Sequence, residues 1–119
     1  MLAQMNNHTP NQSWVVDRGG GVIDKKALVG IDGLDDWERL VYCLWVTDYM
    51  MRNAGDFLNA EVMYPTFQSD AKQFAKKLGL VLTEETFSLS RHKLQREYLG
   101  RFEAMCEEIK SAEKKNTKG

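Results

Sequence analysis

Four polar residues in one short segment are the strongest candidates for chemistry in this sequence. Asp48, Tyr49, Arg52 and Asn53 lie within six consecutive positions. On a helix, an acid followed four positions later by a base forms a favourable ion pair, so Asp48 and Arg52 are predicted to pair. A carboxylate buried without such a partner would be strongly destabilising. The group therefore predicts either an internal ion pair that fixes helix packing, or a pocket that binds a small ligand or performs catalysis.

A single helix over residues 35–54 must position these side chains. Asp35 is a suitable N-cap, and Glu38 three positions later completes a capping box. Gly55 is suited to the left-handed conformation that ends many helices. Apolar residues cover most of the helix circumference, which is typical of a buried helix, and Asp48 falls within this apolar face. We therefore expect this helix to form the buried centre of the domain.

Further amphipathic segments complete the predicted core. Residues 66–78 repeat apolar side chains at helical spacing and are followed by Gly79, which is a common type of helix stop. Residues 90–112 carry another apolar stripe, which recurs every three or four positions. A shorter helix is expected over residues 57–63, before Pro65. These patterns predict an all-α fold, a small single-domain helical bundle.

The two ends of the chain are predicted to lie outside this bundle. Residues 1–21 are mostly polar and contain three consecutive glycines, which is typical of a flexible leader. Its one apolar stretch, residues 13–16, is expected to be a short strand or a clip against the body. In the helical domain of residues 22–112, we expect only a short helical turn near residues 25–28 before the central helix. Residues 113–119 are predicted to form a basic, frayed tail.

The overall composition is that of an ordinary soluble domain. The chain has 119 residues, enough for one domain, and its 43% hydrophobic and 28% charged residues suit an apolar core with a charged surface. A net charge of −1 indicates neither a nucleic-acid nor a membrane partner. No apolar stretch approaches the roughly 20 residues of a membrane span, and the N-terminus lacks a secretory signal pattern. We expect a cytoplasmic protein without direct contact to membranes or nucleic acid.

Cysteines and histidines are too few and too scattered to predict a metal centre. Cys43 and Cys106 lie far apart without a Cys-x-x-Cys motif, and we expect them to be buried thiols in a reducing compartment. His8 and His92 each lack a second ligand at helical spacing. The usual hydrolase, zinc-protease and nucleotide-binding motifs are also absent from the sequence. We therefore predict no metal and no cofactor, and we favour a non-enzymatic protein, with a catalytic pocket around Asp48 as an open alternative.

Charge is distributed unevenly along the chain. Residues 32–70 carry eight acidic and two basic side chains, a net charge of −6, whereas residues 71–119 carry a net charge of +4. The acidic segment is suited to a basic protein partner, such as a toxin or a DNA-binding protein. The alternative is that these charges only solvate the surface and match helix dipoles. The candidate partner-binding residues are Asp32, Asp35, Asp36, Glu38, Asp56 and Glu61.

Two predicted helix ends carry a resemblance to a known family. They are Asn53-Ala54-Gly55-Asp56-Phe57 and Leu78-Gly79. With the order of the elements around them, residues 36–90 resemble a family of small all-helical bacterial proteins that includes a DNA-mimic protein. In that family the first end is Asn-Gly-Gly-Phe, so Ala54 replaces a glycine here and Asp56 is inserted. The resemblance implies an all-α fold and an acidic surface that imitates a DNA backbone and occupies a DNA-binding protein.

The sequence favours a non-enzymatic protein-binding module that acts through an acidic surface. An immunity or antitoxin-like protein and an inhibitor of a DNA-binding protein both fit this hypothesis. The first alternative is the small-ligand or catalytic pocket around Asp48 and Arg52. The second is a structural subunit that forms a homodimer through the apolar stripe of the C-terminal helix. This stripe consists of Leu94, Tyr98, Phe102 and Met105.

Overall fold

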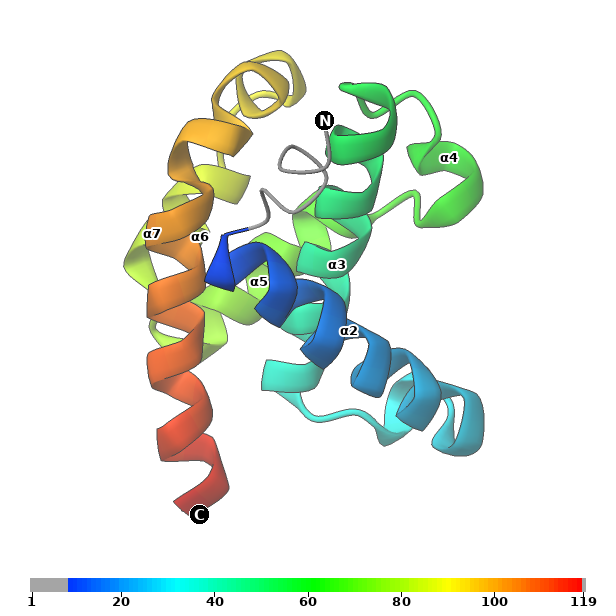
Figure 1. Cartoon of the computed structure of the whole chain (residues 1–119), viewed down its shortest axis with the longest axis vertical. Helices are drawn as coiled ribbons and strands as arrows, with labels where there is room; N and C mark the ends of the chain where they lie inside the picture. The colour runs from blue at the N-terminus through cyan, green and yellow to red at the C-terminus, as the bar shows by residue number, and fades with distance from the viewer. Residues whose placement is uncertain (1–8, 119) are drawn as a thin grey trace, which may run out of the picture.

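Helices make up nearly all of the computed structural model, which describes residues 9–118 (Figure 1). No strand occurs in this part of the chain. The all-α single-domain bundle predicted from the sequence is confirmed. In chain order the elements are α2 (Pro10–Val29), the 3-10 helix η1 (Ile31–Gly33), α3 (Asp36–Ala54), α4 (Ala60–Met63), α5 (Phe67–Leu78), α6 (Val81–Phe87) and α7 (Arg91–Lys118).

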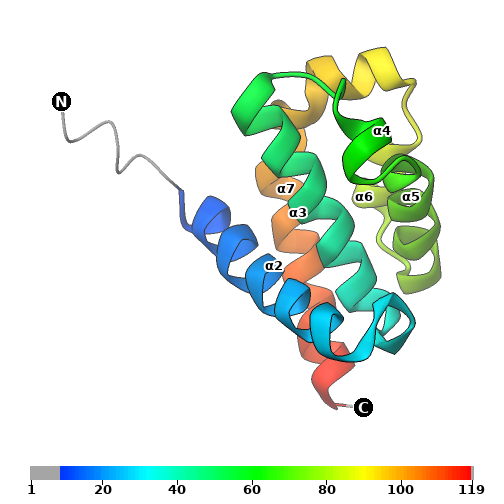
Figure 2. The same cartoon turned by 90° about the vertical axis from the view of Figure 1, so that its right-hand side faces the viewer.

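Helix α3 is the central element of the bundle, as predicted. It packs against α2, α5 and α7, and Figure 2 shows it between α2 and α5. The predicted capping box is present: the Asp35 carboxylate accepts from the Glu38 backbone at 2.8 Å, and the Glu38 carboxylate accepts from the Asp35 backbone at 2.9 Å. Gly55 ends the helix in the left-handed conformation with φ of 74°. Local sequence signals therefore define both ends of this helix.

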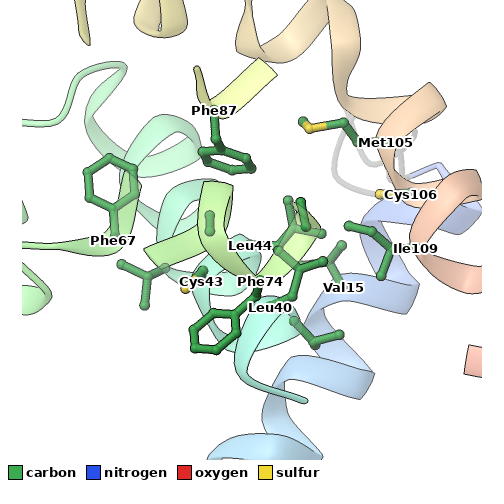
Figure 3. Packing of buried hydrophobic residues seen from close by; sticks show 14 of the residues in the cluster. Val15, Leu40, Cys43, Leu44, Phe67, Phe74, Phe87, Met105, Cys106 and Ile109 are labelled. Carbon is green, nitrogen blue, oxygen red and sulfur yellow. The ribbon is translucent and has the colours of Figure 1, made fainter. Parts of the chain in front are cut away.

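The hydrophobic core joins side chains from every long helix. Figure 3 shows Leu40 and Leu44 of α3 close to Val15 of α2, Phe74 of α5 and Ile109 of α7. These residues are at most 6% exposed. Burial of such apolar side chains contributes about 1.5–3 kcal/mol each, so packing of α3 against its neighbours holds the fold together.

The largest correction concerns the N-terminal segment. The prediction of a flexible leader is wrong for residues 9–21, because Thr9 caps α2 and residues 10–21 form its first half. Residues 22–29, which were expected to form only a short helical turn with extended flanks, form the second half of the same helix. Thr9 caps this helix in a reciprocal capping box with Gln12, whose backbone donates to the Thr9 hydroxyl at 3.1 Å. Pro10 is suited to the first helical position. Residues 1–8 of the predicted leader lie outside the described residues.

Gly19 explains why a glycine run belongs to this helix. A Cβ atom at Gly19 would lie 2.3 Å from Cδ1 of Trp45, so only glycine permits this close approach of α2 to α3. Gly20 and Gly21 have no such neighbour within 4 Å. The glycines that predicted a linker therefore include one that makes the contact between two helices.

The other boundaries differ less from the predicted ones. Helix α5 matches the predicted helix over 66–78, and Ser90 caps α7 through a hydrogen bond from the Lys93 backbone at 3.2 Å. Helix α4 starts at Ala60 rather than at residue 57. Helix α7 continues to Lys118, so the frayed tail predicted from residue 113 is wrong for residues 113–118. One reason is an ion pair between Arg18 of α2 and Glu113, which holds α7 beyond its predicted end.

The predicted homodimer stripe is not available for a second copy of the chain. Leu94 and Tyr98 are 0% exposed, and Phe102 and Met105 are 1% exposed. These side chains line the inner face of α7 and contribute to the core of the monomer. The proposed dimer interface on this stripe is therefore wrong, because the same apolar periodicity serves intramolecular packing.

Candidate functional site

The four candidate residues from the central helix line one pocket. Asp48, Tyr49, Arg52 and Asn53 face a pocket of about 260 Å³ between α2 and α3. Trp45 of the same helix completes this wall. The opposite wall comes from α2, with Gln12, Val15 and Val16. Sequence analysis missed the α2 wall because it assigned those residues to a leader. Their spacing of three and four positions is a signal for one face of a helix, but it does not indicate that this face packs beside Asp48.

Asp48 is the most deeply placed polar group of the pocket. Asp48 is only 6% exposed. Its Oδ1 atom accepts hydrogen bonds from Arg52 Nε at 3.1 Å and from the Tyr98 hydroxyl at 2.8 Å. The predicted ion pair with Arg52 is therefore confirmed. Within residues 9–118, no donor contacts the other carboxylate oxygen, Oδ2. One oxygen of Asp48 thus serves the fold and the other remains available as an acceptor.

Tyr98 is the partner of Asp48 that sequence analysis did not identify. Its ring lies in the apolar stripe of α7 and is fully buried, so its hydroxyl needs a hydrogen-bond partner inside the protein. Burial, followed by the nearby charge and hydrogen bond of Asp48, raises the pKa of Tyr98 well above its usual value of 10.0. Tyr98 therefore stays protonated and donates to Asp48 throughout the physiological pH range.

Arg52 lies at the rim of the pocket with part of its donor capacity unused. Its guanidinium carbon is 4.8 Å from the centre of the Phe102 ring, and its side chain is 33% exposed. Only Nε of the guanidinium donates to an acceptor in the described part of the chain, which leaves both amino groups without one there. Next to it, the Asn53 side-chain amide donates to the Tyr49 carbonyl at 2.7 Å. The pocket therefore offers two unused amino groups of one cationic guanidinium close to an anionic acceptor.

An aromatic pair separates this pocket from a second hollow. The rings of Trp45 and Tyr49, here called the aromatic ridge, stack with centroids 5.3 Å apart and an interplanar angle of 12°. Beyond the ridge, the second hollow is lined on the other side by Asn59, Val62 and Met63. Tyr49 is 47% exposed, so the ridge projects from the buried central helix to the surface. Ligands on its two sides would contact different elements, α2 or α4.

The six acidic candidates do not form one surface patch. Four of them lie at the beginning of α3 or just before it, whereas Asp56 and Glu61 follow its other end. A helix of 19 residues is about 28 Å long, so the two groups lie at opposite ends of the molecule's central helix. The first group consists of Asp32, Asp35, Asp36 and Glu38. In this group Glu38 already pairs with Lys25 at 2.9 Å and takes part in the capping box.

Both cysteines are buried thiols. Cys43 and Cys106 are each 0% exposed, and burial is the main cause that raises the pKa of each thiol from 9.0 to about 12. The Cys43 thiol donates to the Tyr64 hydroxyl at 3.6 Å, and that hydroxyl donates to Asp70 at 2.7 Å. Neither thiol is a nucleophile at neutral pH, because the thiolate is the reactive form. Residues 9–118 also contain no cluster of three or more side chains arranged to bind a metal ion.

The raised thiol pKa values predict a loss of stability at alkaline pH. Above about pH 9 the unfolded chain releases protons that the folded protein retains until about pH 12. The free energy of unfolding should therefore fall between these pH values by about 1.4 kcal/mol per pH unit for each thiol. Urea unfolding at pH 8 to 11 measures the slope. In the variant Cys106→Ala the slope should be smaller by the contribution of one thiol. An unchanged slope in that variant would contradict the raised pKa of Cys106.

Comparison with known proteins identifies no relative that shares this site. None of the helices in the described region is long and apolar enough to cross a membrane. Searches against protein-family models, curated protein sequences and solved structures found no match for the chain.

Proposed function

We propose that this protein is a protein-binding module whose partner contacts the α4 side of the aromatic ridge. The exposure of large apolar side chains on that side supports the proposal. Tyr49 is 47% exposed, and Val62, which lines the hollow on this side, is 87% exposed. Neighbouring exposed apolar groups around a central aromatic side chain are typical of protein interaction sites.

The rigid setting of the ridge favours binding. Three residues directly next to Trp45 or Tyr49 on α3 are at most 2% exposed and belong to the core: Leu44, Val46 and Met50. A partner would therefore meet an ordered surface and would not have to immobilise it. Binding energy is lost when an interface must be ordered, so this arrangement retains more of it.

Charge around the ridge favours a basic partner. Asp56 follows the end of α3 directly, and Glu61 precedes the exposed Val62 in α4. These two acids are suited to the rim of the interface, where charges govern association rate and salt dependence. At the other end of α3, Asp35 and Glu38 form the capping box and Glu38 also pairs with Lys25, and we assign that end of the helix no role in binding. A toxin neutralised by this protein, or a DNA-binding protein inhibited by it, are the partners that this chemistry fits.

A pair of equally exposed apolar residues tests the proposal. Val62 is 87% exposed beside the ridge, and Leu28 is 86% exposed at the far end of α2. Basic proteins from the native host are passed over immobilised wild-type protein, Val62→Ser and Leu28→Ser, and the captured protein is eluted with salt. We expect Val62→Ser to reduce capture of a basic protein by roughly tenfold or more, because the apolar contact is lost without a change of charge. Leu28→Ser should capture as much as wild type. Equal capture by all three proteins would contradict the proposed surface.

A further inference from the structure

The pocket on the α2 side of the ridge has the composition of a small-molecule site. Its walls include the apolar and aromatic side chains of Val15, Val16, Trp45 and Tyr49. Its charged groups, Asp48 and Arg52, both lie on the α3 side. This is the usual make-up of ligand pockets, where a few polar groups orient an otherwise apolar molecule. A volume of about 260 Å³ is close to the lower end of such sites, near 300 Å³. The pocket is therefore suited to a ligand the size of a single amino acid.

The polar side of the pocket selects the head group of the ligand. Asp48 and Arg52 neutralise one another, so an isolated cation or anion gains little net attraction there. Oδ2 of Asp48 accepts no hydrogen bond, and the amino groups of Arg52 donate none, within residues 9–118. A head group that presents a cation and an anion side by side would satisfy both. Such charge-assisted hydrogen bonds are about twice as strong as neutral ones.

From this geometry we propose that the pocket binds a free α-amino acid with a bulky apolar side chain. The ammonium group donates to Oδ2 of Asp48, and the carboxylate accepts from the amino groups of Arg52. The side chain lies between the α2 valines and the aromatic ridge, where Trp45 and Tyr49 offer stacked rings. Asp48 is 6% exposed, and its unpaired Oδ2 keeps some contact with solvent, which the ammonium group of the ligand replaces. This site is distinct from the proposed protein surface, which lies on the α4 side of the ridge.

A series of related compounds tests the head group directly on the wild-type protein. Calorimetric titration compares L-phenylalanine and L-leucine with 3-phenylpropionate, which lacks the ammonium group, and with 2-phenylethylamine, which lacks the carboxylate. We expect the amino acids to bind, and removal of either charge to weaken binding by roughly tenfold or more. The proposal is overturned if neither amino acid binds up to about 10 mM, or if a singly charged analogue binds as tightly.

Two variants with matched controls locate the binding. Arg52→Gln removes the proposed carboxylate contact, and Arg101→Gln removes another ion pair between positions four apart, with Glu97, on the surface of α7. Val16→Phe fills the pocket, whereas Val29→Phe places the same side chain at an equally exposed position of α2; the two valines are 52% and 51% exposed. Arg52→Gln and Val16→Phe should each weaken amino-acid binding by roughly tenfold, while both controls bind as wild type does. Unchanged affinity in Val16→Phe would overturn the assignment even if Arg52→Gln failed to fold.

Discussion

Replacement of Asp48 by alanine is expected to lower the free energy of unfolding by about 3–5 kcal/mol. The change leaves the fully buried Tyr98 hydroxyl without its acceptor at 2.8 Å and Arg52 without its partner at 3.1 Å. A buried polar group that loses its partner retains the whole penalty of its removal from water. Urea unfolding followed by circular dichroism gives the loss from the shift of the midpoint at an unchanged slope.

A double-mutant cycle separates the two partners of Asp48. Tyr98→Phe removes only the hydroxyl and should cost about 1.5–3 kcal/mol, because Asp48 keeps Arg52 but loses a buried donor. In the double variant the Tyr98 hydroxyl and its acceptor are both gone, so the combined loss should be smaller than the sum of the single losses by about 1 kcal/mol or more. A loss with Asp48→Ala no larger than that of Glu97→Ala would contradict this structural role, since the Glu97–Arg101 pair is exposed.

The elements with complete local signals were predictable from the sequence. Helix α3 has a capping box at Asp35, a left-handed glycine at its end and an apolar face, and these signals agree with one another. Helix α5 combines an amphipathic stripe with a glycine stop in the same way. Such agreement between local signals is the condition under which sequence patterns specify a helix.

Helix α2 is harder to predict, because its glycine run opposes a helix locally and is explained only by a tertiary contact. The glycine run at residues 19–21 lowers helix propensity and suggests a linker. The reason for Gly19 lies in Trp45, which is 26 positions away in the sequence and becomes a neighbour only after α2 packs on α3. The Thr9–Gln12 capping box is a local signal of a helix start that the prediction of a leader overlooked.

The candidate site likewise combines residues that local sequence spacing predicts with residues that only tertiary contacts bring together. One helix supplies Asp48, Tyr49, Arg52 and Asn53, so their common face followed from spacing alone. The α2 wall and the Tyr98 donor come from elements far away in the sequence. Their contribution depends on how three helices cross, and no periodicity within one segment contains that information.

Alanine substitutions within the glycine run are expected to act in opposite directions. Gly19→Ala places a Cβ atom 2.3 Å from Cδ1 and 2.9 Å from Cβ of Trp45, so the base of that side chain or the whole helix must move. Overpacking of this kind lowers the free energy of unfolding by about 1–3 kcal/mol. Gly20→Ala and Gly21→Ala meet no neighbour within 4 Å and should raise it by about 0.5–1 kcal/mol each, because alanine is the better helix former. Urea unfolding of the three variants measures both effects.

Gly100→Ala provides a control outside α2, since that position is also helical and has no neighbour within 4 Å. It should be stabilising to the same extent as Gly20→Ala. If Gly19→Ala were as stabilising as these two, α2 would not pack closely on Trp45 in solution. The pocket would then lose its second wall, because Val15 and Val16 belong to the same helix. Conversely, a destabilised but folded Gly19→Ala should also bind the amino-acid ligand more weakly, since the shift of α2 that relieves the clash changes the distance across the pocket.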